Sequence, residues 1–190
     1  MKKTLSRRAR LAAGGAAVAA VAAATFGTVA ANASAPAAPA SVTAAPAKAP
    51  SAGRHTTTTA TRLTVDAAAK AAHAALDAAE REGQRVTVAV VDRDGNTVVT
   101  LRGDGAGPQS YESAERKGFT AVSWNAPTSE LAGRLAQTPN LKDIPGTLFL
   151  AGGVPVTADN APIAGIGVAG APSGTQDEKF ARAGADALSR

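Results

Sequence analysis

The feature of this sequence that most constrains its fold is a tight turn, Asp94-Gly95-Asn96, between two runs of β-branched residues. The runs at 86–91 and 97–101 have the length of strands, and turn residues of this kind join strands that pair antiparallel. A similar pattern recurs where Asp159-Asn160 separates two further apolar runs. Two hairpins predict an α/β fold of the α+β kind, in which helices flank an antiparallel sheet, rather than alternating βαβ units.

A helix is predicted before the first hairpin. Thr64 can cap it and Gly83 can end it. Its apolar positions are small, so the helix should lie close against whatever it covers. The helical spacing predicts a buried stripe made of Val65, Ala69, Ala72, Leu76 and Ala79.

Further elements are expected after the first hairpin. Ser110 is a candidate cap for a helix that continues to about Trp124, and Thr147–Leu150 has the composition of a strand. Thr175 with Glu178 forms a capping-box pattern that predicts a final helix.

The first 33 residues predict an export signal. A cationic start precedes an Ala/Val-rich stretch, and Ala31-Asn32-Ala33 places small residues at the positions a signal peptidase requires. Arg7-Arg8 indicates a twin-arginine signal, although the phenylalanine expected after the pair is missing and general secretion is the alternative. A membrane anchor needs about 20 strongly apolar residues, whereas this stretch is mostly alanine and glycine. We therefore expect a secreted, extracellular protein.

The rest of the chain divides into a spacer and a domain. Residues 34–62 hold almost no large apolar side chain, so burial cannot offset the entropy of ordering them. Residues 63–190 are long enough for one folded domain. Residues 1–33 carry five basic residues and no acid, which leaves fifteen basic and fifteen acidic residues elsewhere. The basic charge therefore belongs to the export signal, and overall charge gives no support to nucleic-acid binding.

Glu112-Ser113-Ala114-Glu115 is the strongest candidate for chemistry from spacing alone. An E-x-x-E pattern on a helix puts both carboxylates on one face, where hard oxygen ligands could hold a cation such as iron. The alternative is structural, because acids in a first turn interact favourably with the helix dipole and Glu112 can pair with Arg116. The residues themselves leave both readings open.

Other candidate sites are weaker. His73 lies mid-helix at the edge of the apolar stripe and His55 lies in the spacer, and no Ser/His/Asp constellation can be assembled. Asp92 and Asp94 have the pattern of turn formers. The glycine-rich run 165–170 alternates with apolar residues inside a strand, so it indicates close approach by another backbone or a ligand, not a dinucleotide loop.

Several longer motifs resemble the GlcG/HbpS family. They are Val88-Ala89-Val90-Val91-Asp92 before Asp94-Gly95, Leu148-Phe149-Leu150-Ala151-Gly152-Gly153-Val154-Pro155-Val156, and Ile166-Gly167-Val168-Ala169-Gly170-Ala171-Pro172-Ser173-Gly174 before Asp177-Glu178. Secreted haem-binding members of this family are similar to the chain in three further places. These are Gly103-Asp104-Gly105-Ala106-Gly107-Pro108, the E-x-x-E motif and Asp143-Ile144-Pro145-Gly146-Thr147.

The resemblance implies a profilin-like α/β sandwich that assembles as a homo-octamer. It also implies binding of haem and iron outside the membrane, and partnership with the ectodomain of a sensor histidine kinase. Carried over residue by residue, it assigns haem-iron ligation to Thr147 and an iron site to Glu112 and Glu115. His73 is the remaining candidate for haem, with His55 as an alternative.

Two functions follow as hypotheses. The first is a secreted haem- and iron-binding protein that senses haem or oxidative stress and modulates the kinase of a two-component system. The second is a small enzyme like looser relatives, acting on a hydroxy acid or a corrinoid. The absence of a recognisable catalytic constellation in the sequence favours binding.

Overall fold

The computed structural model describes residues 50–53 and 55–189. The predicted export signal, residues 34–49 of the predicted spacer and residue 54 lie outside these described residues. Within them, no helix has both the length and the apolar character needed to cross a bilayer.

Four strands form one antiparallel sheet, with the order β2-β1-β4-β3. The strands are β1 (Thr87–Asp92), β2 (Thr97–Arg102), β3 (Gly153–Ala158) and β4 (Ala161–Ala169). Both predicted hairpins are confirmed. The Asp92 carboxylate accepts hydrogen bonds from the backbone amides of Asp94 and Asn96, at 2.9 Å each, so it builds the first turn. Asp159 and Asn160 both have positive φ, as a two-residue hairpin turn requires.

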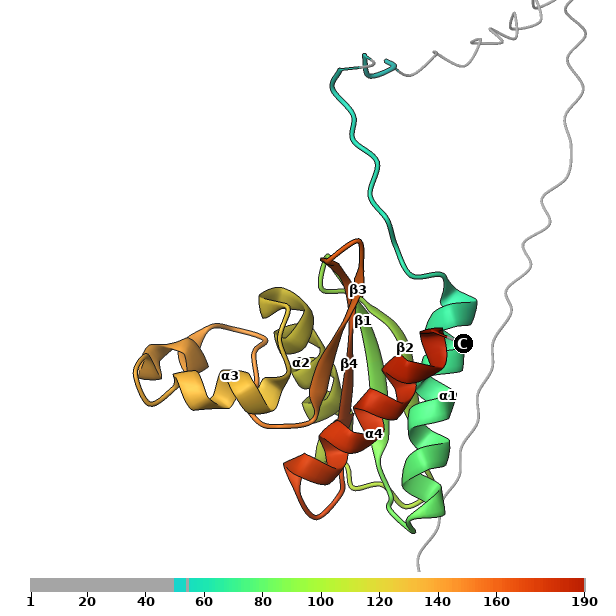
Figure 1. Ribbon diagram of the computed structural model, residues 1–190, viewed down its shortest axis with the longest axis vertical. Coiled ribbons are helices and arrows are strands. Elements are labelled where there is room, and N and C mark those ends of the chain that lie inside the picture. The colour runs from blue at the N-terminus through green and yellow to red at the C-terminus, as the bar shows by residue number, and fades with distance from the viewer. Residues whose placement is uncertain (1–49, 54, 190) are drawn as a thin grey trace, which may run out of the picture. The chain divides into compact units, whose positions relative to one another are not determined.

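Helices cover both faces of the sheet (Figure 1). On one face lie α1 (Val65–Arg81) and α4 (Gly174–Asp186), which pack on each other and on the strands. On the other lies α2 (Gln109–Trp124), followed by α3 (Thr128–Arg134) and a 3-10 turn, η1 (Pro139–Asp143). A second 3-10 turn, η2 (Ala187–Ser189), follows α4. The expected α+β architecture, a sheet flanked by helices, is therefore present.

The larger core lies between the sheet and the α1–α4 layer. Val88, Val90, Ile166, Val168 and Phe180 are all fully buried there. The face of α1 that covers them consists of Ala68, Ala71, Ala72, Ala75 and Ala79.

The predicted stripe of α1 is only partly right. Ala72 and Ala79 are buried as expected, but Val65 is 64% exposed. The closest packing is on the Ala71 side, because a Cβ at Gly184 of α4 would lie only 2.7 Å from the carbonyl oxygen of Ala71. The charged residues of α1 recur at helical spacing and are all exposed, so the sequence does mark the outer side, and the predicted stripe is misplaced because it follows the larger apolar residues.

On the opposite face, α2 lies in backbone contact with β4. A Cβ added at Gly165 would be 2.1 Å from the carbonyl oxygen of Gly118, and one at Gly167 would be 1.9 Å from that of Ala114. The predicted close approach to the bare strand is thus made by the backbone of α2. This contact fixes the position of α2, which carries the E-x-x-E motif.

Three local predictions are wrong. Thr147–Leu150 is not a strand, because its polar groups bond to α2 instead of the sheet: the Leu148 amide donates to the Thr120 hydroxyl at 2.7 Å. Ser110 does not cap α2 but lies within its first turn, where its hydroxyl donates to the Gly107 carbonyl. Ser173, not Thr175, caps α4 by accepting from the amide of Gln176.

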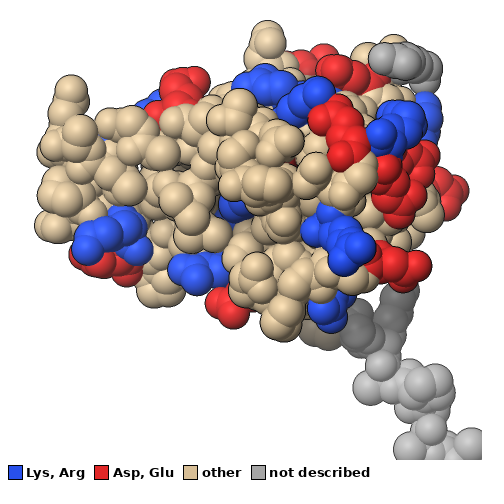
Figure 2. All heavy atoms as spheres, turned by 90° about the horizontal axis from the view of Figure 1, so that it is seen from below, with Lys and Arg blue, Asp and Glu red and all other residues tan. Residues whose placement is uncertain are grey.

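Charges of both signs are spread over the face of the molecule in Figure 2. Basic side chains lie singly or beside acidic ones, with uncharged surface between them. This face therefore presents no continuous basic surface.

Candidate functional site

Glu112 and Glu115 lie at the start of α2, as the E-x-x-E pattern predicts. The side chain of Glu112 is 76% exposed and pairs with Arg116, with 3.5 Å between the two groups. Glu115 is half-buried and accepts a hydrogen bond from the Thr100 hydroxyl of β2 at 3.3 Å. The alternative reading, a Glu112–Arg116 ion pair, is therefore confirmed as a contact, and it leaves an exposed carboxylate that a cation could reach.

Arg116 connects this acidic pair to the candidate haem ligand. One guanidinium nitrogen faces Glu112, and the other donates to the backbone carbonyl of Thr147 at 2.7 Å. Residues 112 and 147 are far apart in the sequence, so only the fold brings the two predicted sites to opposite sides of one side chain.

Thr147 lies in a turn that follows η1. Its side chain is buried, and its hydroxyl donates to the Ile144 carbonyl at 2.7 Å. Gly146 enters the turn with a φ of +80°, a conformation that favours glycine. Ile144 and Leu150, on either side of Thr147 in the sequence, are 41% and 58% exposed. The turn therefore holds a fixed hydroxyl in a segment that also carries two exposed apolar side chains.

The two histidines lie apart from this turn. His73 is exposed on α1, the helix that covers the opposite face of the sheet (Figure 1), and His55 is exposed before the domain. Within one chain the structure does not bring His73 and Thr147 together, so a haem role for His73 stays a prediction.

The described residues contain no group of three or more histidines or acids arranged to hold a metal ion. Glu112 and Glu115 can therefore supply at most two protein side chains to a cation. Water molecules or another copy of the chain must provide the other ligands.

A buried ion pair, which sequence reasoning missed, lies beside this region. The Lys117 ammonium donates to the Asp177 carboxylate at 2.8 Å and to the Val168 carbonyl at 3.0 Å, and both side chains are at least 94% buried. Burial raises the pKa of Asp177, although hydrogen bonds from Lys117 and the Ala171 amide act in the opposite direction. The sequence did contain a signal that Lys117 is buried, because it lies at helical spacing between Ala114 and Ala121 on the buried side of α2.

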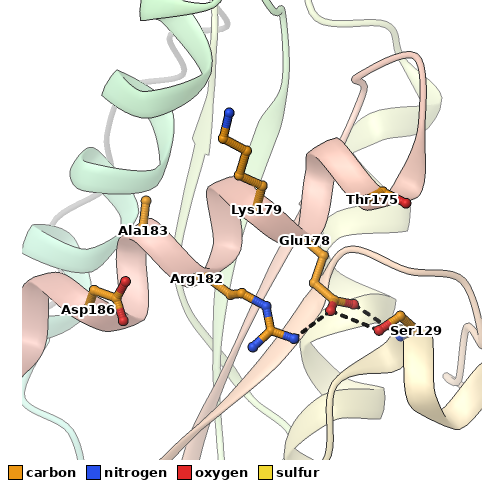
Figure 3. A pocket seen from close by; sticks show the side chains of 7 residues that line it. All are labelled: Ser129, Thr175, Glu178, Lys179, Arg182, Ala183 and Asp186. Atoms are coloured by element: carbon orange, nitrogen blue, oxygen red, sulfur yellow. Dashed lines mark hydrogen bonds and ion pairs between the residues drawn. The ribbon is translucent and has the colours of Figure 1, made fainter.

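A cavity of about 460 Å³ lies along α4. Figure 3 shows Glu178 within it, directed at Ser129 of α3 and at Arg182. The carboxylate accepts from the Ser129 hydroxyl at 2.8 Å, from the Ser129 amide at 3.1 Å and from Arg182 at 2.7 Å. Glu178 thus ties α3 to α4.

Glu178 predicts an acid-dependent loss of stability. Burial raises its pKa, but the hydrogen bonds from Ser129 and Arg182 outweigh that effect and leave the pKa below the usual 4.5. Because Glu178 then binds a proton less readily in the folded state than in the unfolded state, its ionised carboxylate stabilises the fold at pH values above the unfolded pKa. This contribution is lost as the pH falls through the folded pKa.

The measurement is urea unfolding across the acid range for the parent and Glu178→Gln. We expect the variant to be less stable at neutral pH and the two curves to converge as the pH falls. Glu130→Gln, which alters an exposed pair with Arg134, is the control. If the free energy of unfolding of the parent and of Glu178→Gln changed in parallel with pH, the lowered pKa of Glu178 would be contradicted.

A model of the family described as "Haem degrading protein HbpS-like" matches residues 63–186. The chain belongs to the HbpS-like family. HbpS of Streptomyces reticuli, solved as a double mutant with two glutamates replaced by aspartates, is 73% identical. That match covers 75% of this chain and 99% of the other, with a TM-score of 0.73. A second HbpS crystal structure is 74% identical, covers 73% of this chain and 98% of its own, and has a TM-score of 0.72.

More distant HbpS-like folds share the architecture. PduOC, solved as a haem complex, is 26% identical, covers 67% of this chain and 95% of its own, and has a TM-score of 0.62. No curated protein matches the sequence significantly. The family and the two HbpS structures support a haem-related function for this chain.

Proposed function

We propose that the protein is a secreted haem- and iron-binding protein that senses haem or oxidative stress. In this proposal it modulates the ectodomain of a membrane sensor histidine kinase in a two-component system. Family membership supports the haem part, and the resemblance in the sequence supports the sensing part.

The contact that carries the proposal is the double interaction of Arg116. A cation bound by Glu112 and Glu115 would compete with Arg116 for the Glu112 carboxylate, since a guanidinium and a metal ion both need its oxygens. Loss of that partner would change how Arg116 holds the Thr147 carbonyl. Iron at the acidic pair and haem at the turn would therefore influence each other through one side chain.

The turn at Thr147 meets the chemical needs of haem in part. A hydroxyl that donates its proton to the Ile144 carbonyl keeps lone pairs for a metal, and Ile144 and Leu150 offer apolar surface for a macrocycle. Haem, when bound, would supply redox chemistry at its iron. Because Thr147 is only 2% exposed, its turn must move for ligation, and the hydroxyl is a weak ligand. Most of the affinity would therefore come from apolar burial.

Exposed apolar side chains also favour assembly. Tyr111, at the start of α2, is 47% exposed, and Ile144 and Leu150 are exposed as well. We include the homo-octamer in the proposal, since packing of copies would cover such side chains and could complete both sites. Light scattering of the mature protein tests it, and a mass near one chain at micromolar concentration would contradict it.

Iron binding is tested by replacing both acids with their amides. Glu112→Gln with Glu115→Gln keeps the shape of the side chains and removes the charged ligands, so we expect iron affinity to fall at least about tenfold. The fold should persist, because Glu112 is an acid of the first turn, which contributes only about 0.3–1 kcal/mol to a helix, and glutamine at position 115 can still accept the hydrogen bond from Thr100. Iron titration followed by calorimetry measures the effect.

The matched control is Glu130→Gln. Glu130 also lies in a first turn and pairs with an arginine four residues later, but no acid lies three residues from it on α3. Unchanged iron affinity in the double variant would remove Glu112 and Glu115 from the site. An equal loss in Glu130→Gln would show a general effect of charge.

The family description favours a second function, haem degradation. The two functions differ in what happens to the bound haem when a reductant and oxygen are present. A stable Soret band supports binding and sensing, whereas its progressive loss with each turnover supports degradation.

A further inference from the structure

Five threonines lie just before the domain. Thr56, Thr57, Thr58, Thr59 and Thr61 are all exposed, and none lies in a helix or strand. Only Thr56 has a side-chain hydrogen bond within the described part of the chain, from its hydroxyl to the Gly53 carbonyl at 2.7 Å. The other four hydroxyls face solvent without a described protein partner.

The boundary of the domain lies directly after these threonines. Arg62 pairs with Asp92, 3.6 Å away, and with Asp94 in the β1–β2 turn. Thr64 then caps α1 by accepting from the amide of Ala67 at 3.2 Å. The threonine segment therefore ends where tertiary contacts begin, and its backbone is accessible to another protein along its length.

Threonines inside the domain have other roles. Thr87, Thr120, Thr128 and Thr147 are at most 2% exposed. Thr120 accepts from the backbone amide of Leu148, between α3 and β3, and Thr128 accepts from that of Gly153, the first residue of β3. The exposed threonines of the domain lie singly, at positions 64, 97, 138, 157 and 175, so only residues 56–61 present exposed threonines in one cluster without helix or strand.

The surrounding composition is of the kind that carries O-linked sugars. Pro36, Pro39, Pro46 and Pro50 precede the threonines in an Ala/Ser/Thr background. Proline-containing, Ser/Thr-rich segments of this kind are typical of O-glycosylated stalks, because proline keeps the chain extended and the hydroxyls accessible.

We propose that Thr56–Thr59 and Thr61 are sites of O-glycosylation, added by a glycosyltransferase during or after export. The inference rests on the proposed secretion, because the modified form is the exported one. In the reaction, a threonine hydroxyl oxygen attacks the anomeric carbon of a sugar carried on a phosphate ester. The sugar–phosphate bond breaks, the phosphate leaves with the electron pair, and a base of the transferase takes the hydroxyl proton.

The sugars would protect an otherwise cleavable segment. Exposed chain without secondary structure is a preferred target of proteases, and bulky polar groups on consecutive residues hinder their access. The modification would thus preserve the connection between the domain and the residues that precede it.

The test uses the full chain, expressed in the organism that encodes it and collected separately from cells and medium. Intact-mass spectrometry of the exported form should show additions in whole hexose units, up to five per chain, one for each threonine of the segment 56–61. Peptide fragmentation should place them at residues 56–61. The additions should disappear when all five threonines are replaced by alanine and persist when all five are replaced by serine, which keeps the hydroxyl.

Thr138→Ala is the control, because Thr138 is exposed but lies within the domain, directly before η1. It should leave the additions unchanged. Exported protein of unmodified mass, additions that persist in the alanine variant, or phosphate in place of hexose would overturn the proposal while leaving secretion intact. Protein found only in the cells would overturn secretion itself, and glycosylation with it.

Discussion

Gly167→Ala should destabilise the protein by about 3 kcal/mol, the upper end of the usual cost of overpacking a core. The added methyl would lie 1.9 Å from the carbonyl oxygen of Ala114 and 2.5 Å from the amide nitrogen of Gly118. Neither atom belongs to a flexible side chain, so α2 as a whole must move away from β4. Natural domains have a stability of only about 5–15 kcal/mol, and the loss is therefore a large fraction of the total.

Urea unfolding measures this effect, with Gly133→Ala as the control. Gly133 lies in α3, and no atom would be within 4 Å of its added methyl. Removing a glycine from an exposed helix should stabilise it by roughly 0.5–1 kcal/mol. A Gly167→Ala protein as stable as the parent would contradict the backbone contact between α2 and β4.

Lys117→Met should cost about 3–5 kcal/mol, because it leaves the Asp177 carboxylate buried without its partner. Methionine has a similar length, so the loss reports the missing charge rather than a cavity. Lys117 also lowers the pKa of Asp177, so its removal raises that pKa further. The loss should therefore be smaller in acid, where Asp177 is protonated in both proteins, and should grow as the pH rises above the raised pKa that Asp177 has in the folded parent.

Two further variants make this result specific. Adding Asp177→Asn to Lys117→Met removes the unpaired charge, so we expect part of the stability to return. Lys179→Met breaks the exposed pair with Glu82 and should have little effect, since surface pairs contribute about 0–1 kcal/mol. Equal losses in Lys117→Met and Lys179→Met, or a loss that does not depend on pH, would contradict the role of the buried pair.

Local chemistry made much of the fold predictable. The hairpins follow from Asp94-Gly95-Asn96 and Asp159-Asn160, since these residues accept the backbone conformations of tight turns. Thr64 and its neighbours define the start of α1 in the same way. In each case the deciding atoms lie within a few residues of one another, so the sequence contains the necessary information.

Elements that depend on distant partners were not predictable. Thr147–Leu150 has strand composition, but its backbone bonds to α2 side chains, among them Thr120. The close approach of Ala71 in α1 to Gly184 in α4 joins positions more than a hundred residues apart. The pairing of Lys117 with Asp177 likewise depends on how α4 meets the end of β4.

In the candidate site, too, local features could be predicted from the sequence and contacts between distant residues could not. The E-x-x-E motif could be placed on α2 from its spacing, and resemblance to the family singled out Thr147. No local pattern indicated that Arg116 contacts both, because that contact needs the turn after η1 to lie against α2. Nor could the sequence place His73 on the face opposite the turn, since that depends on the packing of α1.

Haem binding at the Thr147 turn is the central claim, and titration of the mature protein with haemin tests it most directly. We expect a saturable shift of the Soret band. In Thr147→Ala the spectrum should change while affinity falls only moderately, because in the proposed site most of the binding energy would come from apolar burial. Thr147→Ser, which keeps the hydroxyl, should resemble the parent. A shift of the Soret band that never saturates would contradict specific haem binding. Identical spectra for the parent and Thr147→Ala would show that Thr147 is not a ligand of the haem iron.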